Sequence, residues 1–398
     1  MQTLNNALYR DTALKHYFAV SFLGGKYMDY SETLDKIITK ARAEANRLGY
    51  AIPYIPDENG QYKDADSIYW WTNGFWAGIM WQLYHVSGEE IFKKTAESSE
   101  ERLDTALDGF ENIDHDTGFL WLHTAGANYR LTGNERSKRR VLHAATTLAG
   151  RYNPDLEIIR AWDGQWIHGY DTAGAAIVDT MMNLPLLHLA SNITGDSRFK
   201  SIAMRHANTM LKYMIRRDGS SNHQIVFDTN THELIAAPGG QGYGEGSSWS
   251  RGLAWAIYGY ALSYRYTGET EYLDAAKRCS AYFNANASLT DYVPLADFRA
   301  PKTPVYYDTT AGACAACGML EIASFVSEYE KPQYIQNAER LISALDEKWC
   351  DYNPETDGIL DGGSVRYHAE KHHEKIIYGD YFYIEAILRM LGRDFLIW

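Results

Sequence analysis

Paired helical segments recur along this chain, and that repetition leaves few folds open. In the first four pairs, an apolar run leads to Thr-Gly or Ser-Gly, and an amphipathic run follows. The four apolar runs are Phe75–Tyr84, Ala125–Leu131, Asp179–Ile193 and Trp255–Tyr266. A fifth run, Thr310–Phe325, lacks the glycine and is followed by Ile335–Ile342. The last run, Tyr381–Met390, could pair with the helical segment Ser31–Leu48.

The glycines and the apolar pattern predict two rings of helices. Glycine readily adopts the left-handed conformation that ends a helix, so each Thr-Gly or Ser-Gly marks a helix terminus. The runs before the glycines are apolar nearly all round, which indicates inner helices. The following runs carry one apolar face, as in Phe199, Ile202, Ala203, His206, Ala207 and Met210. About six hairpins predict an all-α closed toroid, with an open solenoid as the alternative. We expect a single domain over residues 1–398.

Two stretches interrupt the helical pattern, at 223–246 and 291–308. We expect them to form loops and short strands at one rim of the toroid, where a site would lie.

The chain has 30 Tyr, 11 Trp and 13 Phe, and Tyr and Trp suit a partner that is half apolar and half wet, such as a sugar ring. The formal net charge of −13 argues against a nucleic-acid partner. An anionic ligand would need a local basic pocket.

The cysteine count and the amino-terminal segment indicate the cellular compartment in which the protein is expected. Four cysteines are too few for a disulfide scaffold. Cys314 and Cys317 have the spacing of a zinc pair, but no second pair accompanies them, so small core residues on a helix are the favoured interpretation. Met1–Asn6 lacks the basic and apolar regions of a leader, and no apolar run is long enough to span a membrane. We expect a soluble, cytoplasmic protein that is a monomer or a homodimer.

Asp179 is the most unusual position in the sequence, because it lies inside an apolar run. Its neighbours include Val178 and Met181, so the carboxyl should lose hydration and its pKa should rise. A raised pKa is what a general acid near neutral pH requires. Asn183 lies four residues on and could orient it. The alternative is a helix cap or a buried structural acid with a partner.

Asp114-His115-Asp116-Thr-Gly resembles the opening of a calcium loop, but the twelfth position is Ala125 where that loop needs Glu. Two interpretations stay open. The side chains could cap backbone groups of a turn, or Asp116 could be a second active-site carboxylate. We expect no metal.

Arg251 and Trp255 lie four residues apart, after a predicted serine cap within Ser247–Ser250. A guanidinium beside an indole could bind a sugar carboxylate, and an internal Arg–Asp pair is the alternative. The glycine-rich stretch 239–246 is no dinucleotide motif, because no apolar strand precedes it, and no phosphate-binding loop is expected, because Gly-Lys-Ser/Thr is missing. No cofactor is expected.

Trp71 and Trp162 stand beside polar turns, where they could line a sugar site or pack in the core. The stretch His368–His373, with Lys371 in it, is locally basic. It could be a solvated loop, a weak metal site or an outer anion subsite.

From about Trp71 onward, the motifs resemble those of the unsaturated glucuronyl hydrolases, glycoside hydrolase family 88. Each motif is short, but the set in this order is specific. The matching segments are Trp71-Thr-Asn-Gly-Phe-Trp76, Asp114-His-Asp-x-Gly-Phe-Leu120, Ala161-Trp162, Asp179-x-x-x-Asn-Leu-Pro-Leu-Leu187, Asp218-Gly-Ser-Ser-x-His223, Gln241-Gly, Ser248-Trp-x-Arg-Gly-x-Ala-Trp-x-Ile-Tyr-Gly259, Tyr307-Asp308, Ala316-Cys-Gly-x-Leu-Glu-Ile322 and Gly379-Asp-Tyr-x-Tyr-x-Glu-Ala386.

The resemblance implies an (α/α)6 barrel that removes a 4,5-unsaturated uronic acid from the non-reducing end of lyase-generated oligosaccharides. In such an enzyme an Asp protonates the vinyl ether at C4, water adds at C5, and the hydrated sugar opens and leaves. Asp179 aligns with the general acid/base and Asp116 with a second essential aspartate. The resemblance places other residues as follows: His223, Gln241, Arg251 and Trp255 at substrate-contacting positions, and Trp71 and Trp162 as aromatic walls.

The sequence also departs from the family pattern. Many members have Asp-His-His-Asp before the glycine, and here one His is missing, so His115 is the only ring left to make that contact. Members active on sulfated fragments carry Ser-x-x-Ser-x-Lys near the last helix, where this chain has Arg366, Ala369 and Lys371. Unsaturated rhamnogalacturonyl hydrolases, a sugar epimerase on the same barrel and a non-enzymatic glycan-binding toroid are the alternatives. The preferred uronide and its sulfation stay open.

Overall fold

The computed structural model describes residues 28–398 except 111, 165 and 168, so the segment Met1–Asn6 lies outside the described residues. The α-helices are α2 (Tyr30–Leu48), α3 (Asn73–Ser87), α4 (Glu90–Arg102), α5 (Asp104–Gly109), α6 (Thr117–Trp121), α7 (Ala127–Thr132), α8 (Glu135–Gly150), α9 (Leu184–Thr194), α10 (Ser197–Tyr213), α11 (Ser250–Thr267), α12 (Thr270–Ala287), α13 (Thr309–Ala323), α14 (Lys331–Trp349) and α15 (Ile377–Met390). A π-helical turn, η1 (Leu122–Gly126), joins α6 to α7, and short 3-10 turns are η2 (Thr172–Gly174), η3 (Val178–Met182) and η4 (Ser288–Thr290). The strands are β1 (Tyr152–Asn153), β2 (Ile158–Ile159), β3 (Trp166–Ile167), β4 (Tyr170–Asp171), β5 (Ala175–Ile177), β6 (Gln224–Phe227) and β7 (Leu234–Ala236).

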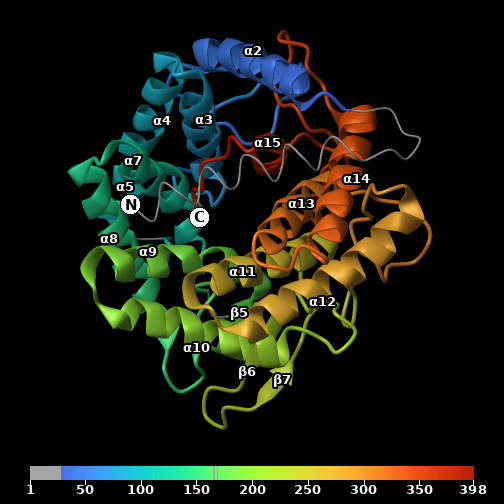
Figure 1. The fold of residues 1–398 in the computed structure, drawn as a ribbon. Coiled ribbons are helices and arrows are strands. Elements are labelled where there is room, and N and C mark those ends of the chain that lie inside the picture. Colours follow the sequence, from blue (N-terminus) through green and yellow to red (C-terminus); the bar gives the residue numbers. More distant parts are fainter. Residues whose placement is uncertain (1–27, 111, 165, 168) are drawn as a thin grey trace.

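The helices form two concentric rings in chain order (Figure 1). The inner ring consists of α3, the α6–α7 segment, α9, α11, α13 and α15, and each packs against an outer helix, which are in turn α4, α8, α10, α12, α14 and α2. Because α15 packs on both α2 and α3, the ring is closed, and the solenoid alternative is wrong. The all-α (α/α)6 toroid predicted from the hairpins is confirmed.

The predicted helix ends are confirmed at all four glycines. Gly88, Gly133, Gly195 and Gly268 are left-handed caps with φ between 70° and 76°. The next residue but one then starts an outer helix. At the second and third hairpins the intervening side chain, Asn134 or Asp196, accepts a backbone hydrogen bond from that helix. The Gly-Asn and Gly-Asp pairs therefore end one helix and begin the next within a few residues.

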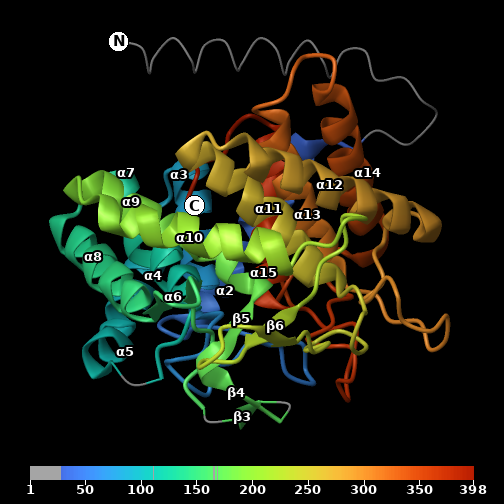
Figure 2. The ribbon, with the colours of Figure 1, turned by 90° about the horizontal axis from the view of Figure 1, so that it is seen from below.

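One end of the barrel carries the strands and the long connections (Figure 2). Strands β5, β6 and β7 form one antiparallel sheet, and β1–β2 and β3–β4 are two-stranded. The prediction of short strands in the rim loops is confirmed for 223–246, which contains β6 and β7. The stretch 291–308 contains only isolated bridges, at Leu295, Asp297 and Tyr307, and no named strand.

Two local predictions are wrong. The run from Asp179 to Ile193 is not one helix, because η3 and α9 are separate elements. Pro185 stands in the first turn of α9; it has no N–H for a continuous helix, but it suits a helix start. The predicted serine cap of α11 is also wrong: Trp249 is the N-cap residue, without a side-chain cap bond, and the Ser250 hydroxyl donates to the Ala296 carbonyl.

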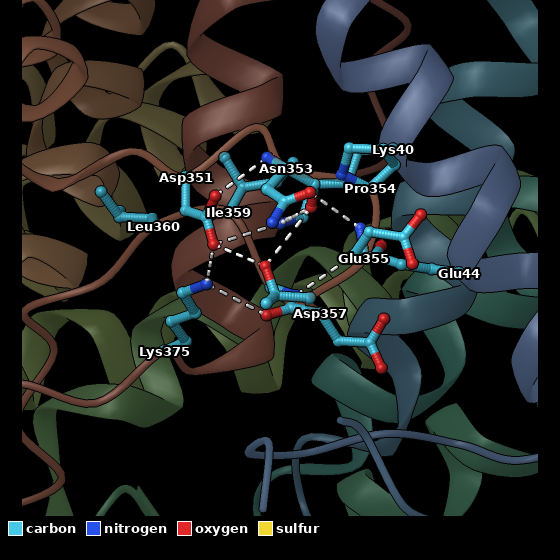
Figure 3. A network of polar contacts seen from close by, with 12 residues as sticks. Lys40, Glu44, Asp351, Asn353, Pro354, Glu355, Asp357, Ile359, Leu360 and Lys375 are labelled. Carbon is cyan, nitrogen blue, oxygen red and sulfur yellow. Dashed lines mark hydrogen bonds and ion pairs between the residues drawn. The ribbon is translucent and has the colours of Figure 1, made fainter. Parts of the chain in front are cut away.

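The ring closes through polar contacts between α2 and the chain that leads into α15 (Figure 3). Lys40 Nζ donates to the Asn353 carbonyl at 2.9 Å and lies 3.6 Å from Asp351, which also pairs with Lys375 at 2.6 Å. Glu44 accepts the Gly358 N–H at 2.9 Å. These contacts fasten the first helix of the ring to the last.

Cys314 and Cys317 are buried and unpaired in α13, which confirms the core interpretation over a zinc pair. No helix among the described residues combines the length and apolarity needed to cross a membrane.

Candidate active site

The sheet at the rim brings Asp179 to His223. Strand β5 pairs antiparallel with β6, and the Val178 N–H donates to the His223 carbonyl at 3.1 Å. Asp179 then follows in η3, so its side chain meets that of His223 just before β6. His223 Nε2 lies 3.1 Å from Asp179 Oδ1, and both side chains are buried. Two residues 44 positions apart are therefore joined by strand register.

A glycine-rich turn holds the other edge of the His223 ring. The backbone N–H of Gln241 donates to His223 Nδ1 at 2.9 Å. Trp249 packs on the ring with centroids 4.4 Å apart. Gln241 thus meets the predicted site through its main chain.

Asp116 enters the site from the turn before α6. Asp114 Oδ1 accepts the Asp116 N–H at 2.8 Å, and the Thr117 hydroxyl donates to the Asp114 carbonyl at 2.7 Å. Turn capping therefore falls to Asp114 and leaves the Asp116 carboxyl free to point inward, where it is 9% exposed. Turn capping is therefore confirmed for Asp114, and the role of Asp116 as a second active-site carboxylate stays a prediction.

Asn183 connects the two aspartates. Its Nδ2 donates to Asp116 Oδ1 at 3.3 Å and to the Asp179 carbonyl at 3.2 Å, while its Oδ1 accepts the Phe119 N–H at 2.8 Å. The expected contact between Asn183 and the Asp179 carboxyl is replaced by one to the Asp179 backbone. The amide fixes the spacing between η3 and α6.

The pKa values of the two carboxyls are shifted in opposite directions. Burial, followed by the charges of Asp114 and Asp179, raises the pKa of Asp116 well above its ordinary value. Burial also raises the pKa of Asp179, but the hydrogen bond that His223 donates to this carboxyl opposes it, and the pKa of Asp179 is lowered. The expectation of a raised pKa at Asp179 is wrong, because its histidine partner is distant in sequence and could not be foreseen.

His115 and Trp162 stand beside Asp116. His115 Nδ1 lies 3.0 Å from the Thr180 hydroxyl and 3.5 Å from Asp116 Oδ1. The Trp162 ring meets the His115 ring edge-on at 5.9 Å and is partly exposed. Burial lowers the pKa of His115. Trp162 therefore forms part of the boundary of the site, next to the ring that remains from the family motif.

Arg251 makes its polar contacts inside the protein. Its guanidinium pairs with Asp308 at 2.6 Å and donates to the carbonyls of Ser364 and Val365, and it is 1% exposed. The structure therefore contains the internal Arg–Asp pair, and the binding of a sugar carboxylate by Arg251 and Trp255 stays a prediction. Trp255 is fully buried.

An aromatic layer nevertheless joins Arg251 to Trp71. The Arg251 guanidinium lies over the Trp249 ring at 4.6 Å and the Tyr378 ring at 5.1 Å. Trp71, which is partly exposed, meets Tyr378 at 5.1 Å. Sequence reasoning missed Trp249 and Tyr378 as members of this layer. An aromatic residue at the start of each of the inner helices α11 and α15 was the available signal.

Lys371 lies on the outer part of the rim and is exposed. On the same loop, His368 Nε2 contacts the Tyr243 carbonyl at 2.8 Å. Tyr170, Tyr243 and His368 help to line a cavity of about 350 Å³ beside the glycine-rich turn. Lys371 therefore lies on the same loop as His368, which lines a cavity at the rim.

Among the described residues, Asp114, His115 and Asp116 each bring a potential metal ligand atom within 4.8 Å of the others. The Asp114 carboxylate already caps the turn and His115 Nδ1 already faces Thr180, so these atoms have roles in the protein itself.

Comparisons with known proteins give a consistent picture. The unsaturated glucuronyl hydrolase of Bacillus sp. (strain GL1) is 36% identical over 352 residues, which cover 86% of this chain and 92% of that protein. The unsaturated chondroitin disaccharide hydrolase of Streptococcus pyogenes serotype M1 is 30% identical over 367 residues, 91% of each chain. No protein-family model matches the sequence.

The fold comparison agrees. The crystal structure of the Bacillus sp. GL1 unsaturated glucuronyl hydrolase, described as responsible for the degradation of glycosaminoglycan, superposes with a TM-score of 0.86 at 34% identity, covering 91% of this chain and 96% of that one. The barrel and its likeness to these enzymes define a glycoside hydrolase of the (α/α)6 class. The chain belongs to the unsaturated glucuronyl hydrolase family.

Proposed function

We propose that this enzyme releases the 4,5-unsaturated uronic acid from the non-reducing end of lyase-generated, glycosaminoglycan-type oligosaccharides. The two relatives are named for unsaturated glucuronyl and chondroitin disaccharide substrates, which supports this substrate class. The observation that carries the proposal is the pair of buried carboxyls, Asp179 and Asp116, tied together by Asn183 at the rim of the barrel.

The proposed chemistry starts with a proton on Asp179. Transfer of that proton to C4 breaks the C4=C5 π bond and leaves a cation shared by C5 and the ring oxygen. Water then forms a bond to C5 and returns a proton to the Asp179 carboxylate. The resulting hemiketal opens, and the sugar leaves as a keto acid with release of the next sugar. One water is consumed, and Asp179 regains its starting protonation.

Substrate binding would favour the protonated form of Asp179, which takes its proton from solvent. A uronic acid brings a carboxylate and displaces water, and both changes raise the pKa of a neighbouring carboxyl. The lowered pKa of Asp179 is therefore compatible with an acid role once substrate is bound. We assign Asp116, whose pKa is raised, to positioning the substrate and tuning Asp179.

The other predicted contacts stay part of the proposal. His115, His223 and Gln241 would border the reacting sugar, with Trp71 and Trp162 as its aromatic walls. Arg251 and Trp255 would act from behind the aromatic layer, since both are buried. We also propose a cytoplasmic location, which the four unpaired thiols support, and a monomer or homodimer.

Asp179→Asn tests the central assignment. We expect a loss of at least about 1,000-fold in kcat, because the amide cannot donate and recover a proton. The measurement is the fall in ultraviolet absorbance of the conjugated double bond in lyase-generated disaccharides. Asp66→Asn, at an exposed aspartate, is the matched control. Near-native turnover by Asp179→Asn would contradict the assignment, and a product with unchanged mass would indicate an epimerase.

Lys371→Ala tests the proposed anion subsite at the rim. We expect KM for sulfated disaccharides to rise about 3- to 10-fold, with unsulfated substrates unaffected, since an exposed charge pair contributes modestly. A panel of sulfated and unsulfated disaccharides measures the difference. Lys348→Ala, at an exposed lysine of the outer helix α14, is the control. Equal KM values for every sulfated substrate would remove the subsite.

A further inference from the structure

Both ring nitrogens of His223 have a hydrogen-bond partner, a backbone N–H at Nδ1 and a carboxyl oxygen at Nε2. A backbone N–H can only donate, so the 2.9 Å contact from Gln241 requires a lone pair on His223 Nδ1. An imidazole with a lone pair on Nδ1 carries its one ring proton on Nε2. Nε2 lies 3.1 Å from Asp179 Oδ1 and therefore donates to it.

This donation determines where Asp179 can carry a proton. Because Oδ1 accepts from His223, a proton on Asp179 must sit on the second oxygen, Oδ2. A carboxyl held in this way presents its acidic hydrogen in one direction only.

We propose that the Gly239–Gln241 turn locks His223 in its Nε2–H tautomer and thereby fixes the transferable proton of Asp179 on Oδ2. In this arrangement His223 is a positioning residue that does not donate its own proton to substrate. The assignment of a tautomer stands on geometry alone, whereas its catalytic consequence rests on the proposed function.

Glycine at position 240 is what allows the turn to come this close. Gly240 has φ +59°, and a Cβ there would lie 1.9 Å from His223 Nδ1 and 2.7 Å from Gln224 Nε2. The contact with the His223 ring cannot be tolerated unless the ring or the turn moves. The Trp249 ring, 4.4 Å away, holds the plane of the imidazole from another side. Gly240 also lies within the tight turn that the Gly242 N–H closes by donating to the Gly239 carbonyl at 3.0 Å.

Nitrogen NMR of protein labelled with ¹⁵N-histidine tests the tautomer without any turnover. The His223 signals are assigned by their loss in His223→Gln. We expect Nδ1 to resonate as an unprotonated nitrogen and Nε2 as a protonated one, at the pH used for the assay. A wild-type spectrum in which the assigned His223 signals show a protonated Nδ1 would overturn the proposal.

Three variants test whether the glycine-rich turn determines the tautomer of His223. Gly240→Ala should displace the Gln241 N–H and give a mixture of tautomers or a doubly protonated ring. Gly244→Ala should leave the His223 spectrum unchanged, because a Cβ there meets nothing within 4 Å. Gln241→Ala keeps the backbone N–H and should also leave it unchanged. A folded Gly240→Ala with the wild-type tautomer, or a Gln241→Ala with an altered one, would refute the role of the turn.

The kinetic readout separates this proposal from the proposed function. Gly240→Ala should lower kcat about 100-fold, with a smaller change in KM, because a misdirected proton affects the chemical step most. A normal kcat together with a changed tautomer would refute the catalytic consequence. Failure of the proposed function would instead leave wild-type protein inactive on unsaturated uronides while the tautomer measurement still held.

Discussion

At the scale of single residues, two buried carboxyls in one site hold their protons unequally because their neighbours differ. Asp116 has Asp114 and Asp179 nearby, whereas Asp179 has the ring of His223. The sequence was sufficient to predict that Asp179 is buried. It could not predict the direction of the shift, because the histidine that determines it lies 44 residues away and arrives through strand register. The same limit applies to Arg251, whose partner Asp308 is 57 residues away.

Asp116→Asn tests the raised pKa of that carboxyl. A carboxyl with a folded-state pKa above its unfolded value binds more protons in the native state, so stability falls as pH rises from about 4 through the raised pKa. The Asn variant has no such loss. We expect it to be more stable than wild type at neutral and alkaline pH, by about 1.4 kcal/mol for each unit of the upward shift, while activity is lost.

Urea unfolding across a pH series measures this difference. Asp66→Asn serves again as the exposed control. If Asp116→Asn and wild type lose stability in parallel as the pH rises, the raised pKa of Asp116 is contradicted.

At the scale of elements, the helices that sequence periodicity identified best are those ended by glycine. The segment after β5 was harder to predict, because its apolar composition fits a buried strand, a 3-10 turn or an inner helix equally well. Pro185 was the signal that α9 begins late. The π-helical turn η1 between α6 and α7 had no sequence signal that we can name. The contact of α2 with α15 was predicted from the unpaired last run and is confirmed.

Glu44→Gln tests the closure of the ring by α2. Burial, followed by the charge of Asp380, raises the pKa of Glu44 from 4.5 to about 8. Its raised pKa means that stability is lost as pH rises from about 4.5 to about 8. Gln keeps an oxygen for the Gly358 N–H, so the variant should lose less stability than wild type over that interval.

Thermal unfolding at several pH values measures this effect. Glu32→Gln, at an exposed residue of the same helix, should follow wild type. A Glu44→Gln profile that parallels wild type through about pH 8 would show that Glu44 is ionised in the folded protein.

At the scale of the whole molecule, the repeated hairpins determine a closed ring, and the inserted segments gather the site at one end of it (Figure 2). Both features follow from patterns within short stretches of sequence, which is why they were predictable. The contacts inside the site join β5, β6, α6 and the loop before α11, which lie far apart in the chain. Their distances needed the folded structure. A single folding domain over 1–398 stays a prediction.

The most direct test of the account is hydrolysis in D₂O followed by NMR of the released sugar at short reaction times. If Asp179 delivers its proton to the alkene, one deuterium appears at C4, in one of its two positions, and Asp179→Asn produces none at a comparable rate. Release of a sugar that still carries its C4=C5 double bond, with no deuterium at C4, would contradict the account, because the bond broken would then be the glycosidic one.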